Sequence, residues 1–262
     1  MAKFITHKED FDRINLLNKI NSILFWALLG INILPGLLKR LLTNPAEMDC
    51  YASLINFLII VSFIASIVIA IIVEYYLIPV AESKRRADYF ENSFNHNFQL
   101  KNSEEYFTNE EINPGFYKMA VNLFQNLFFT ISVAKLMIPK VIFKAAIGLL
   151  IFISISFIGF KNDPIFITLL QAIFSLNITG QTIKFFIYHE RKKRMMQELQ
   201  MLFSNSESIK GVKAVPRIIK LYTDYECNIS WGLISLDDKL FNKHNNALEE
   251  KWGNIKLKLK IL

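Results

Sequence analysis

The sequence predicts an all-α membrane protein with four transmembrane helices and a mainly helical cytoplasmic domain. Hydrophobic residues make up 52% of the 262 residues, yet 20% of the chain is charged, which indicates that apolar and charged residues occupy separate segments. Nine glycines and seven prolines are too few for a low-complexity or fibrous protein. Two cysteines do not support a disulfide-stapled secreted domain. We therefore expect membrane helices joined to a substantial water-facing part.

The first pair of membrane helices is predicted near the N-terminus. No charge interrupts the 19 residues from Ile20 to Leu38 or the 24 residues from Cys50 to Val73. A helix of ~20 residues crosses a hydrocarbon core of ~30 Å. These runs predict helices over 20–39 and 52–79, which form a hairpin within an N-terminal segment, 1–81.

A second hairpin is predicted over 138–188. The 20 residues from Pro164 to Ile183 carry no charge and predict a helix over 164–187. The preceding uncharged run, Ala145 to Phe160, has 16 residues. It can span as a helix over 138–160 if Lys140 and Lys144 extend toward the headgroups.

Basic residues predict the orientation of these helices. Lys84, Arg85 and Arg86 follow the second predicted helix, and the run Arg191–Arg194 follows the fourth. Short connections rich in Lys and Arg remain in the cytoplasm. A multi-pass protein with both termini in the cytoplasm is therefore expected.

Two cytoplasmic blocks, 82–137 and 189–262, remain. The first contains apolar residues at helical spacing that lead toward the third predicted span, namely Phe116, Ala120, Leu123, Leu127 and Ile131. The last eight residues, IKLKLKIL, alternate like a strand but also continue a helical stripe from Leu248 and Trp252. We favour a helix for the first part of this segment.

Catalytic signatures are absent from the sequence. The four histidines are dispersed, and no Gly-rich loop precedes a Lys-Ser or Lys-Thr pair. No nucleophile elbow is present. Carboxylate pairs such as Glu104–Glu105 and Asp237–Asp238 lie in acidic loops and have the character of solvated surface. We expect neither an enzyme nor a cofactor or metal site, which directs attention to binding and conduction.

Five polar residues fall on one stripe of the fourth predicted helix. Polar groups within a bilayer must face protein or water. The stripe is compatible with a pore wall, in which hydroxyl and amide groups replace part of an ion's hydration shell, and equally with hydrogen bonds between packed helices. Four helices cannot enclose a wide aqueous path, so a channel requires a homo-oligomer, for which we expect a tetramer. The pore-lining candidates are Thr168, Gln171, Ser175, Thr179 and Thr182.

Basic residues of the cytoplasmic blocks are candidates for binding an anion. Block 189–262 has 14 Lys and Arg residues against 9 Asp and Glu residues. Several of its cations could converge on phosphates, although a solvated surface is the alternative. In the first block, basic groups stand beside aromatic residues, an arrangement that suits nucleotides but equally suits packing against the second block. The ligand-binding candidates are Lys210, Lys213, Arg217, Lys220, Arg85 and Arg86.

The run Arg191–Lys192–Lys193–Arg194 has a simpler interpretation. It follows the fourth predicted helix directly, where cations are attracted to anionic lipid headgroups. We expect it to lie at the membrane edge.

Two sequence stretches resemble four-transmembrane effectors of bacterial antiphage systems. They are SKRRADYFENSFN, residues 83–95, and LYTDYECNISWGLISLDDKLFNKHNNALEEKW, residues 221–252. The second stretch contains a Tyr-Glu pair, an acidic-Lys pair and a final Trp, here Tyr225–Glu226, Asp238–Lys239 and Trp252. The layout and these stretches are similar to the SMODS-associating four-transmembrane family and to the channel-like effector of the Hailong system.

The resemblance implies a toxic effector in the bacterial inner membrane, encoded beside a cognate nucleotidyltransferase. In related systems a nucleotide second messenger activates the effector, or a short DNA oligomer holds the channel closed. It thus implies a homo-oligomeric, nucleotide-gated or oligonucleotide-gated ion channel that depolarises the host membrane. The bilayer, further copies of the chain and the nucleotide or oligonucleotide are its implied partners.

Two other functions remain open from the sequence. The chain could be a non-conducting membrane scaffold whose cytoplasmic domain recruits a protein partner. A transporter is less favoured, because four short spans provide neither inverted repeats nor a carboxylate at mid-membrane depth.

Overall fold

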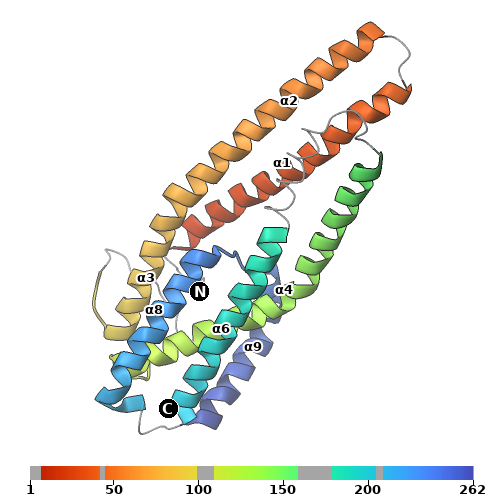
Figure 1. The fold of residues 1–262 in the computed structure, drawn as a ribbon. Helices are drawn as coiled ribbons and strands as arrows, with labels where there is room; N and C mark the ends of the chain where they lie inside the picture. The colour runs from red at the N-terminus through yellow and green to blue at the C-terminus, as the bar shows by residue number, and fades with distance from the viewer. Residues whose placement is uncertain (1–6, 42–44, 99–108, 159–178, 205–208, 262) are drawn as a thin grey trace.

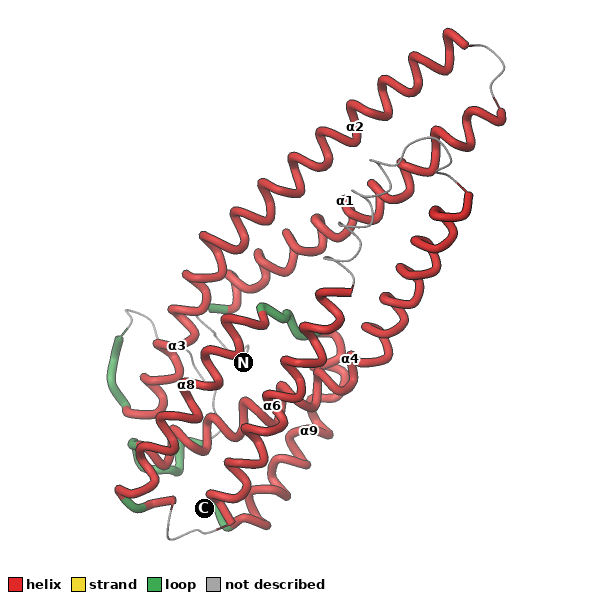
Figure 2. Tube along the Cα trace, viewed as in Figure 1, coloured by secondary structure: helices red, strands yellow, loops and turns green. Residues whose placement is uncertain are grey.

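The computed structural model describes residues 7–41, 45–98, 109–158, 179–204 and 209–261. Throughout these ranges the chain is helical apart from short turns and loops, with no strand (Figure 2). Helices α1 (Lys8–Leu41) and α2 (Pro45–Ile71) pack together and extend away from the other helices (Figure 1). The all-α part of the predicted fold class is confirmed for the described residues.

Helix α2 continues without a loop into the next two elements. A π-helical segment, η1 (Ile72–Leu77), joins α2 to α3 (Ile78–Phe94). Pro79, in the first turn of α3, has no N–H to donate, and its ring would crowd the carbonyl four residues earlier. The widened π turn just before it accommodates this defect. Asn95 ends α3 in the left-handed conformation, with φ 53°, which Asn adopts more readily than most residues.

Helix α4 (Phe116–Ile158) is 43 residues long and contains Pro139. It changes direction near its middle (Figure 1), and the internal proline accounts for the bend. Its first half lies among the helices of the lower part of the molecule, and its second half extends in the same general direction as α1 and α2.

The C-terminal part of the chain is built from α6 (Gly180–Ser204), the short 3-10 helix η3 (Val212–Ala214), α8 (Val215–Gly232) and α9 (Asp238–Leu259). Asp237 caps α9 by accepting hydrogen bonds from the backbone N–H groups of Lys239 and Leu240. The favoured helix for the first part of the last eight residues is confirmed, because α9 continues to Leu259.

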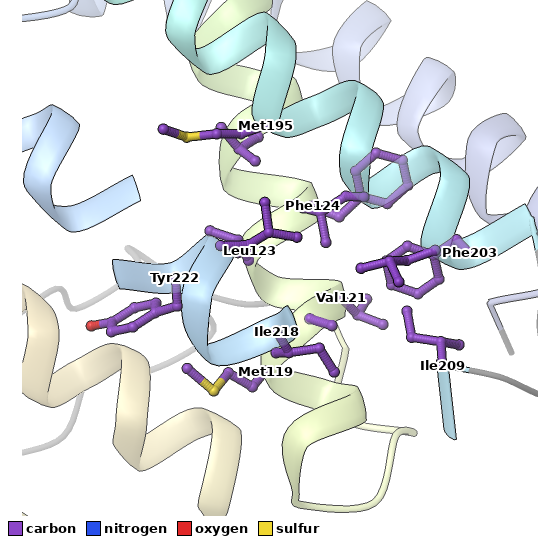
Figure 3. Packing of buried hydrophobic residues seen from close by; sticks show 14 of the residues in the cluster. Met119, Val121, Leu123, Phe124, Met195, Phe203, Ile209, Ile218 and Tyr222 are labelled. Carbon is purple, nitrogen blue, oxygen red and sulfur yellow. The ribbon is translucent and has the colours of Figure 1, made fainter. Parts of the chain in front are cut away.

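Helices α3, α4, α6, α8 and α9 pack around one hydrophobic centre, which we call the helical core (Figure 3). Leu123 and Phe124 of α4, Leu199 and Phe203 of α6 and Trp252 of α9 are fully or almost fully buried there. Phe124 stacks on Phe203 with ring centroids 5.1 Å apart and meets the edge of Trp252 at 5.4 Å. Such pairs add to the stabilisation that comes from apolar burial.

The prediction of four transmembrane helices is wrong. Among the described residues, one helix is long and apolar enough to cross a membrane, the continuous helix Ser53–Phe94. Only 6% of its most apolar 18-residue window is buried inside the protein. This helix is consistent with membrane association and corresponds to the second predicted span, 52–79.

The other three predicted spans are not found as candidate membrane helices, and the reason differs for each. Span 20–39 lies within α1, a longer helix whose first half is charged, and its side chains beyond Ala27 are outside the described set. Span 138–160 lies in α4, whose described part carries Lys135, Lys140 and Lys144. Most of span 164–187 lies outside the described residues. Within the described residues, counting uncharged runs therefore overestimated the number of spans.

The surface of the α2 span indicates where a bilayer interface would lie. Many apolar side chains along α2, such as Phe57 and Ile60, are exposed, although Ile55 is buried. At its end, within η1, Tyr75 is 78% exposed and Tyr76 is 69% exposed. Tyrosines at the end of an apolar helix are typical of a membrane–water interface.

Two glycines provide a matched test of helix packing. A Cβ atom added to Gly232 would lie 2.4 Å from Cδ2 of the buried Tyr188 ring, whereas one added to Gly253 would meet nothing within 4 Å. We expect Gly232→Ala to lower the free energy of unfolding by about 1–3 kcal/mol through overpacking. We expect Gly253→Ala to be neutral or stabilising by about 0.5–1 kcal/mol through helix propensity.

Chemical denaturation of the purified, detergent-solubilised protein measures both effects. Equal stabilities for the two variants would contradict the close approach of α6 and α8 at Gly232.

Candidate functional site

A cluster of buried charges lies where α3, α6 and α8 meet. Arg85 of α3 donates hydrogen bonds to Glu82 Oε2 from Nε at 3.0 Å and from Nη2 at 2.7 Å, and Nη2 also donates to Glu226 of α8. The side chains of Arg85 and Glu226 are only 11% and 12% exposed. Arg86 is more exposed and lies 3.9 Å from both carboxylates. Because a buried cation requires a compensating anion, this cluster fixes α3 against α8.

Lys192 of α6 is the fifth member of the cluster and has an unusual environment. Its side chain is completely buried, and its Nζ has no hydrogen-bond partner among the described residues. The Nζ lies 3.3 Å from the centre of the Tyr225 ring and 5.1 Å from that of Tyr188. Burial, assisted by the positive charge of Arg85, holds the pKa of Lys192 well below its usual range. The aromatic faces, together with the carboxylates of Glu226 and Glu82 nearby, partly offset the cost of burying this lysine.

Aromatic side chains surround the charges and exclude water from them. Tyr89 of α3 stacks on Tyr222 of α8 with ring centroids 4.8 Å apart, and Phe90 meets the same ring at 5.1 Å. The Tyr89 hydroxyl donates a hydrogen bond of 2.5 Å to the Met119 carbonyl of α4. Burial raises the pKa of Tyr222 and of Tyr188, so both phenols remain neutral. The cluster therefore links α3, α6 and α8.

The ligand candidates predicted on α3 take part in this cluster. Arg85 is committed to Glu82 and Glu226, and Arg86 lies at their edge. The aromatic residues beside them pack inside the helical core, which was the alternative interpretation of that stretch.

The candidates predicted on the C-terminal block lie on the surface and have different partners. Lys220 pairs with Asp224 at 2.7 Å and lies 3.9 Å from Glu198. Lys210 lies over the Tyr117 ring at 5.1 Å. Lys213 in η3 and Arg217 in the first turn of α8 are exposed. On α8, Arg217 is more than two helical turns away from Glu226, the partner of Arg85. The ligand candidates on α3 and α8 are therefore separated.

The pore candidates fall mostly outside the described residues. Thr168, Gln171 and Ser175 are not among those residues, Thr179 is exposed just before α6, and Thr182 lies in the first turn of α6. Thr182 lines a cavity of about 480 Å³ at the junction between the extended helices and the helical core. That cavity was not predicted from the sequence.

Seven helical elements (α1, α2, η1, α3, α4, α6 and the last residue of α8) and one loop form the walls of this junction cavity. Asn21 of α1 and Ser66 of α2 face it and are joined by a hydrogen bond from the serine hydroxyl to the amide oxygen. Glu74 of η1, Lys144 of α4 and Lys184 of α6 supply its charges. The loop between α8 and α9 closes one side of the cavity.

Polar contacts hold this loop in place. Ser235 donates a hydrogen bond to the Asn15 side chain of α1, and Lys140 of α4 donates to Asp237 at 2.6 Å. The hydrogen bond from Lys140 lowers the pKa of Asp237, which keeps the α9 cap ionised. The loop thus ties α1 and the bent helix α4 to the end of α8.

The N-terminus is attached to α3 by similar contacts. His7 Nδ1 lies 2.6 Å from Asp88 Oδ2, and Lys84 pairs with Asp10 at 2.6 Å. Within the described residues, no group of three or more metal-ligating side chains gathers. The polar features of this part of the molecule therefore connect helices to one another.

The sequence reasoning missed the role of Lys192. That residue was placed in a basic run at the membrane edge, and Arg191, Lys193 and Arg194 are indeed exposed, but Lys192 is buried. A usable signal was present, since Tyr188, Lys192, Met195 and Leu199 follow helical spacing and are all buried. A lysine within an apolar stripe is easily assigned to the charged run beside it.

Comparison with known proteins identifies no relative: no protein-family model, curated protein or solved structure matches the chain.

Loss of the Glu226 carboxylate should weaken the contact between α3 and α8. We expect Glu226→Gln to lower the free energy of unfolding by about 2 kcal/mol, since a charge-assisted hydrogen bond to buried Arg85 is lost. The matched control is Glu190→Gln on α6, because Glu190 and its partner Lys193 are both more than half exposed and 3.9 Å apart. This control should change stability by less than about 0.5 kcal/mol. Urea denaturation of both variants tests the difference, which should vanish if Glu226 is solvated.

Lys192 should make stability depend on pH in a defined direction. The unfolded chain keeps the lysine protonated up to its ordinary pKa of 10.5, whereas the folded chain releases that proton at lower pH. The free energy of unfolding should therefore rise with pH between the lowered pKa and 10.5. We expect Lys192→Met to remove this rise and, at neutral pH, to be neutral or stabilising by up to about 2 kcal/mol.

Denaturation across neutral and alkaline pH measures this effect, with exposed Lys193→Met as the control that retains the rise. A strongly destabilised Lys192→Met variant with an unchanged pH profile would contradict the assignment.

Proposed function

We propose that this chain is a membrane effector of antiphage defence, a homo-oligomeric ion channel controlled by a nucleotide or short oligonucleotide. Its opening depolarises the inner membrane of the bacterial host. The observation that carries the proposal is the continuous helix Ser53–Phe94, which contains both the candidate membrane span and Arg85 of the buried charge cluster. A change at the cluster reaches the span through this helix without crossing a loop.

The ligand side of the proposal rests on α8. Lys213 in η3 and Arg217 in the first turn of α8 are both exposed, so two cations lie near the start of α8. Two exposed cations close together in the chain favour a phosphate. Nine residues farther along, Glu226 holds Arg85 of α3. A phosphate bound at the start of α8 would thus bias the position of α3 and, with it, the span.

The conducting part requires several copies of the chain. The single candidate span found among the described residues cannot enclose an aqueous path, so the ions pass between subunits in this proposal. The exposed apolar surface of α2 is available both to lipid and to neighbouring subunits. Gln171 and Ser175 lie outside the described residues, so they are pore candidates from the sequence alone.

Flux measurements test conduction directly. Purified full-length protein is reconstituted into vesicles, and ion flux is followed with cyclic nucleotides or short DNA oligomers and without them. We expect flux that changes with at least one of these ligands and falls in a Gln171→Leu, Ser175→Leu variant. The absence of flux under all conditions would exclude the channel and favour the non-conducting scaffold.

Neutralising the free cations of α8 should affect the ligand response selectively. We expect the double variant Lys213→Gln, Arg217→Gln to raise the ligand concentration needed for a half-maximal response by about tenfold or more, because two phosphate contacts are lost. Any ion flux that the parent protein shows without ligand should be unchanged in this variant. The matched control is Lys193→Gln, an exposed lysine of α6 outside this surface. An unchanged response in the double variant would move the ligand site elsewhere.

A further inference from the structure

The junction cavity combines charged and neutral polar groups in a way that suits a particular ligand. Lys144 and Lys184 bring two positive charges from different helices, and Glu74 brings one negative charge. Asn18, Ser22 and Gln181 add hydrogen-bonding groups. A volume of about 480 Å³ is within the range of small-molecule sites. The lining fits a compact anion that carries hydroxyl groups.

Basic and aromatic groups continue the positive surface beyond the cavity. Lys184 lies 5.8 Å from the Trp231 ring centre, and Arg191 lies over the same ring at 4.4 Å. Trp231 is partly exposed at the end of α8. Cations beside an indole ring are typical of a membrane–water interface. Tryptophan is enriched there because its ring is apolar and its N–H group is polar.

The position of the cavity along the span identifies the source of the ligand. Glu74, which lines the cavity, immediately precedes Tyr75 and Tyr76, the exposed tyrosines that indicate the interface. Beside Lys144 on α4, Ile142 and Phe143 are exposed apolar side chains. A ligand in the cavity would therefore have its polar group at headgroup depth and apolar helix surface next to it.

We propose that the junction cavity binds the headgroup of an anionic phospholipid of the phosphatidylglycerol type. The phosphodiester pairs with Lys144 and Lys184, and the glycerol hydroxyls bond to Glu74 and to the amide groups of the wall. The acyl chains lie along the exposed apolar surface of α4 and α2. This is the recognition mode of basic pockets between membrane helices. The inference rests on the membrane location in the proposed function, but it does not require conduction.

Such a lipid would contact α1, η1, α4 and α6 at one point. It would stabilise the junction in the way that any ligand of the folded state does, since bound ligand raises the free energy of unfolding. The site is separate from the phosphate surface proposed at the start of α8.

The test uses full-length protein in non-ionic detergent. Native mass spectrometry and thermal unfolding follow binding of phosphatidylglycerol, with phosphatidylcholine, inorganic phosphate and glycerol phosphate as comparisons. We expect phosphatidylglycerol to bind and to raise the unfolding temperature more than any comparison ligand. Lys144→Gln and Lys184→Gln should each weaken its binding by about tenfold. The matched controls, Lys135→Gln on α4 and Lys193→Gln on α6, remove exposed lysines outside the cavity and should bind as the parent does.

The outcomes separate the lipid site from the rest of the proposal. Equal lipid binding in the cavity variants and controls, with unchanged stability in the absence of lipid, would overturn the site. Equal effects of inorganic phosphate and phosphatidylglycerol would assign the cavity to a free anion and would also overturn it. Failure of the protein to float with vesicles would refute the membrane location. Lipid-specific binding without ion flux would support the lipid site and refute only the channel.

Discussion

The ion pair between Arg85 and Glu226 is the contact on which the arrangement of α3, α6 and α8 depends. A guanidinium inside a helical core is tolerated only with a carboxylate at hand, so α8 must present Glu226 where α3 presents Arg85. Lys192 enters the same space and is accommodated by tyrosine faces. Since α3 and α2 form one helix, this buried pair also determines how the candidate span leaves the core.

Two regions connect the helical core to the extended helices, and they differ in character. The charge cluster is surrounded by aromatic rings, so a shift of α8 would be passed on to α3. The junction cavity is hollow and polar, and its walls come from helices that are far apart in sequence. A ligand at α8 and a lipid at the junction would therefore act on the same continuous helix, through Arg85 of α3 and through Glu74 of η1 respectively.

Much of the helical content was predictable, because apolar residues such as Leu123 and Leu127 repeat at helical spacing and are buried as that spacing predicts. The number of spans was not predictable, because the length of an uncharged run does not show which residues pack against that helix. The partner of Arg85 was not predictable from the sequence either. Glu226 is 141 positions away, and only the packing of α3 against α8 brings the two side chains together. Lys192 shows the same limit, since its burial depends on neighbours that the local run of cations conceals.

The π-helical segment Ile72–Leu77 alters the angular phase between the two ends of the long helix. A π turn contains more residues than an α turn, so each residue advances the chain by a smaller rotation about the axis. Side chains on α2 and α3 that an uninterrupted 3.6-residue repeat would place on one face are therefore offset around the helix. The side of α2 that meets α1 cannot be deduced by extending the buried stripe of α3 across Glu74.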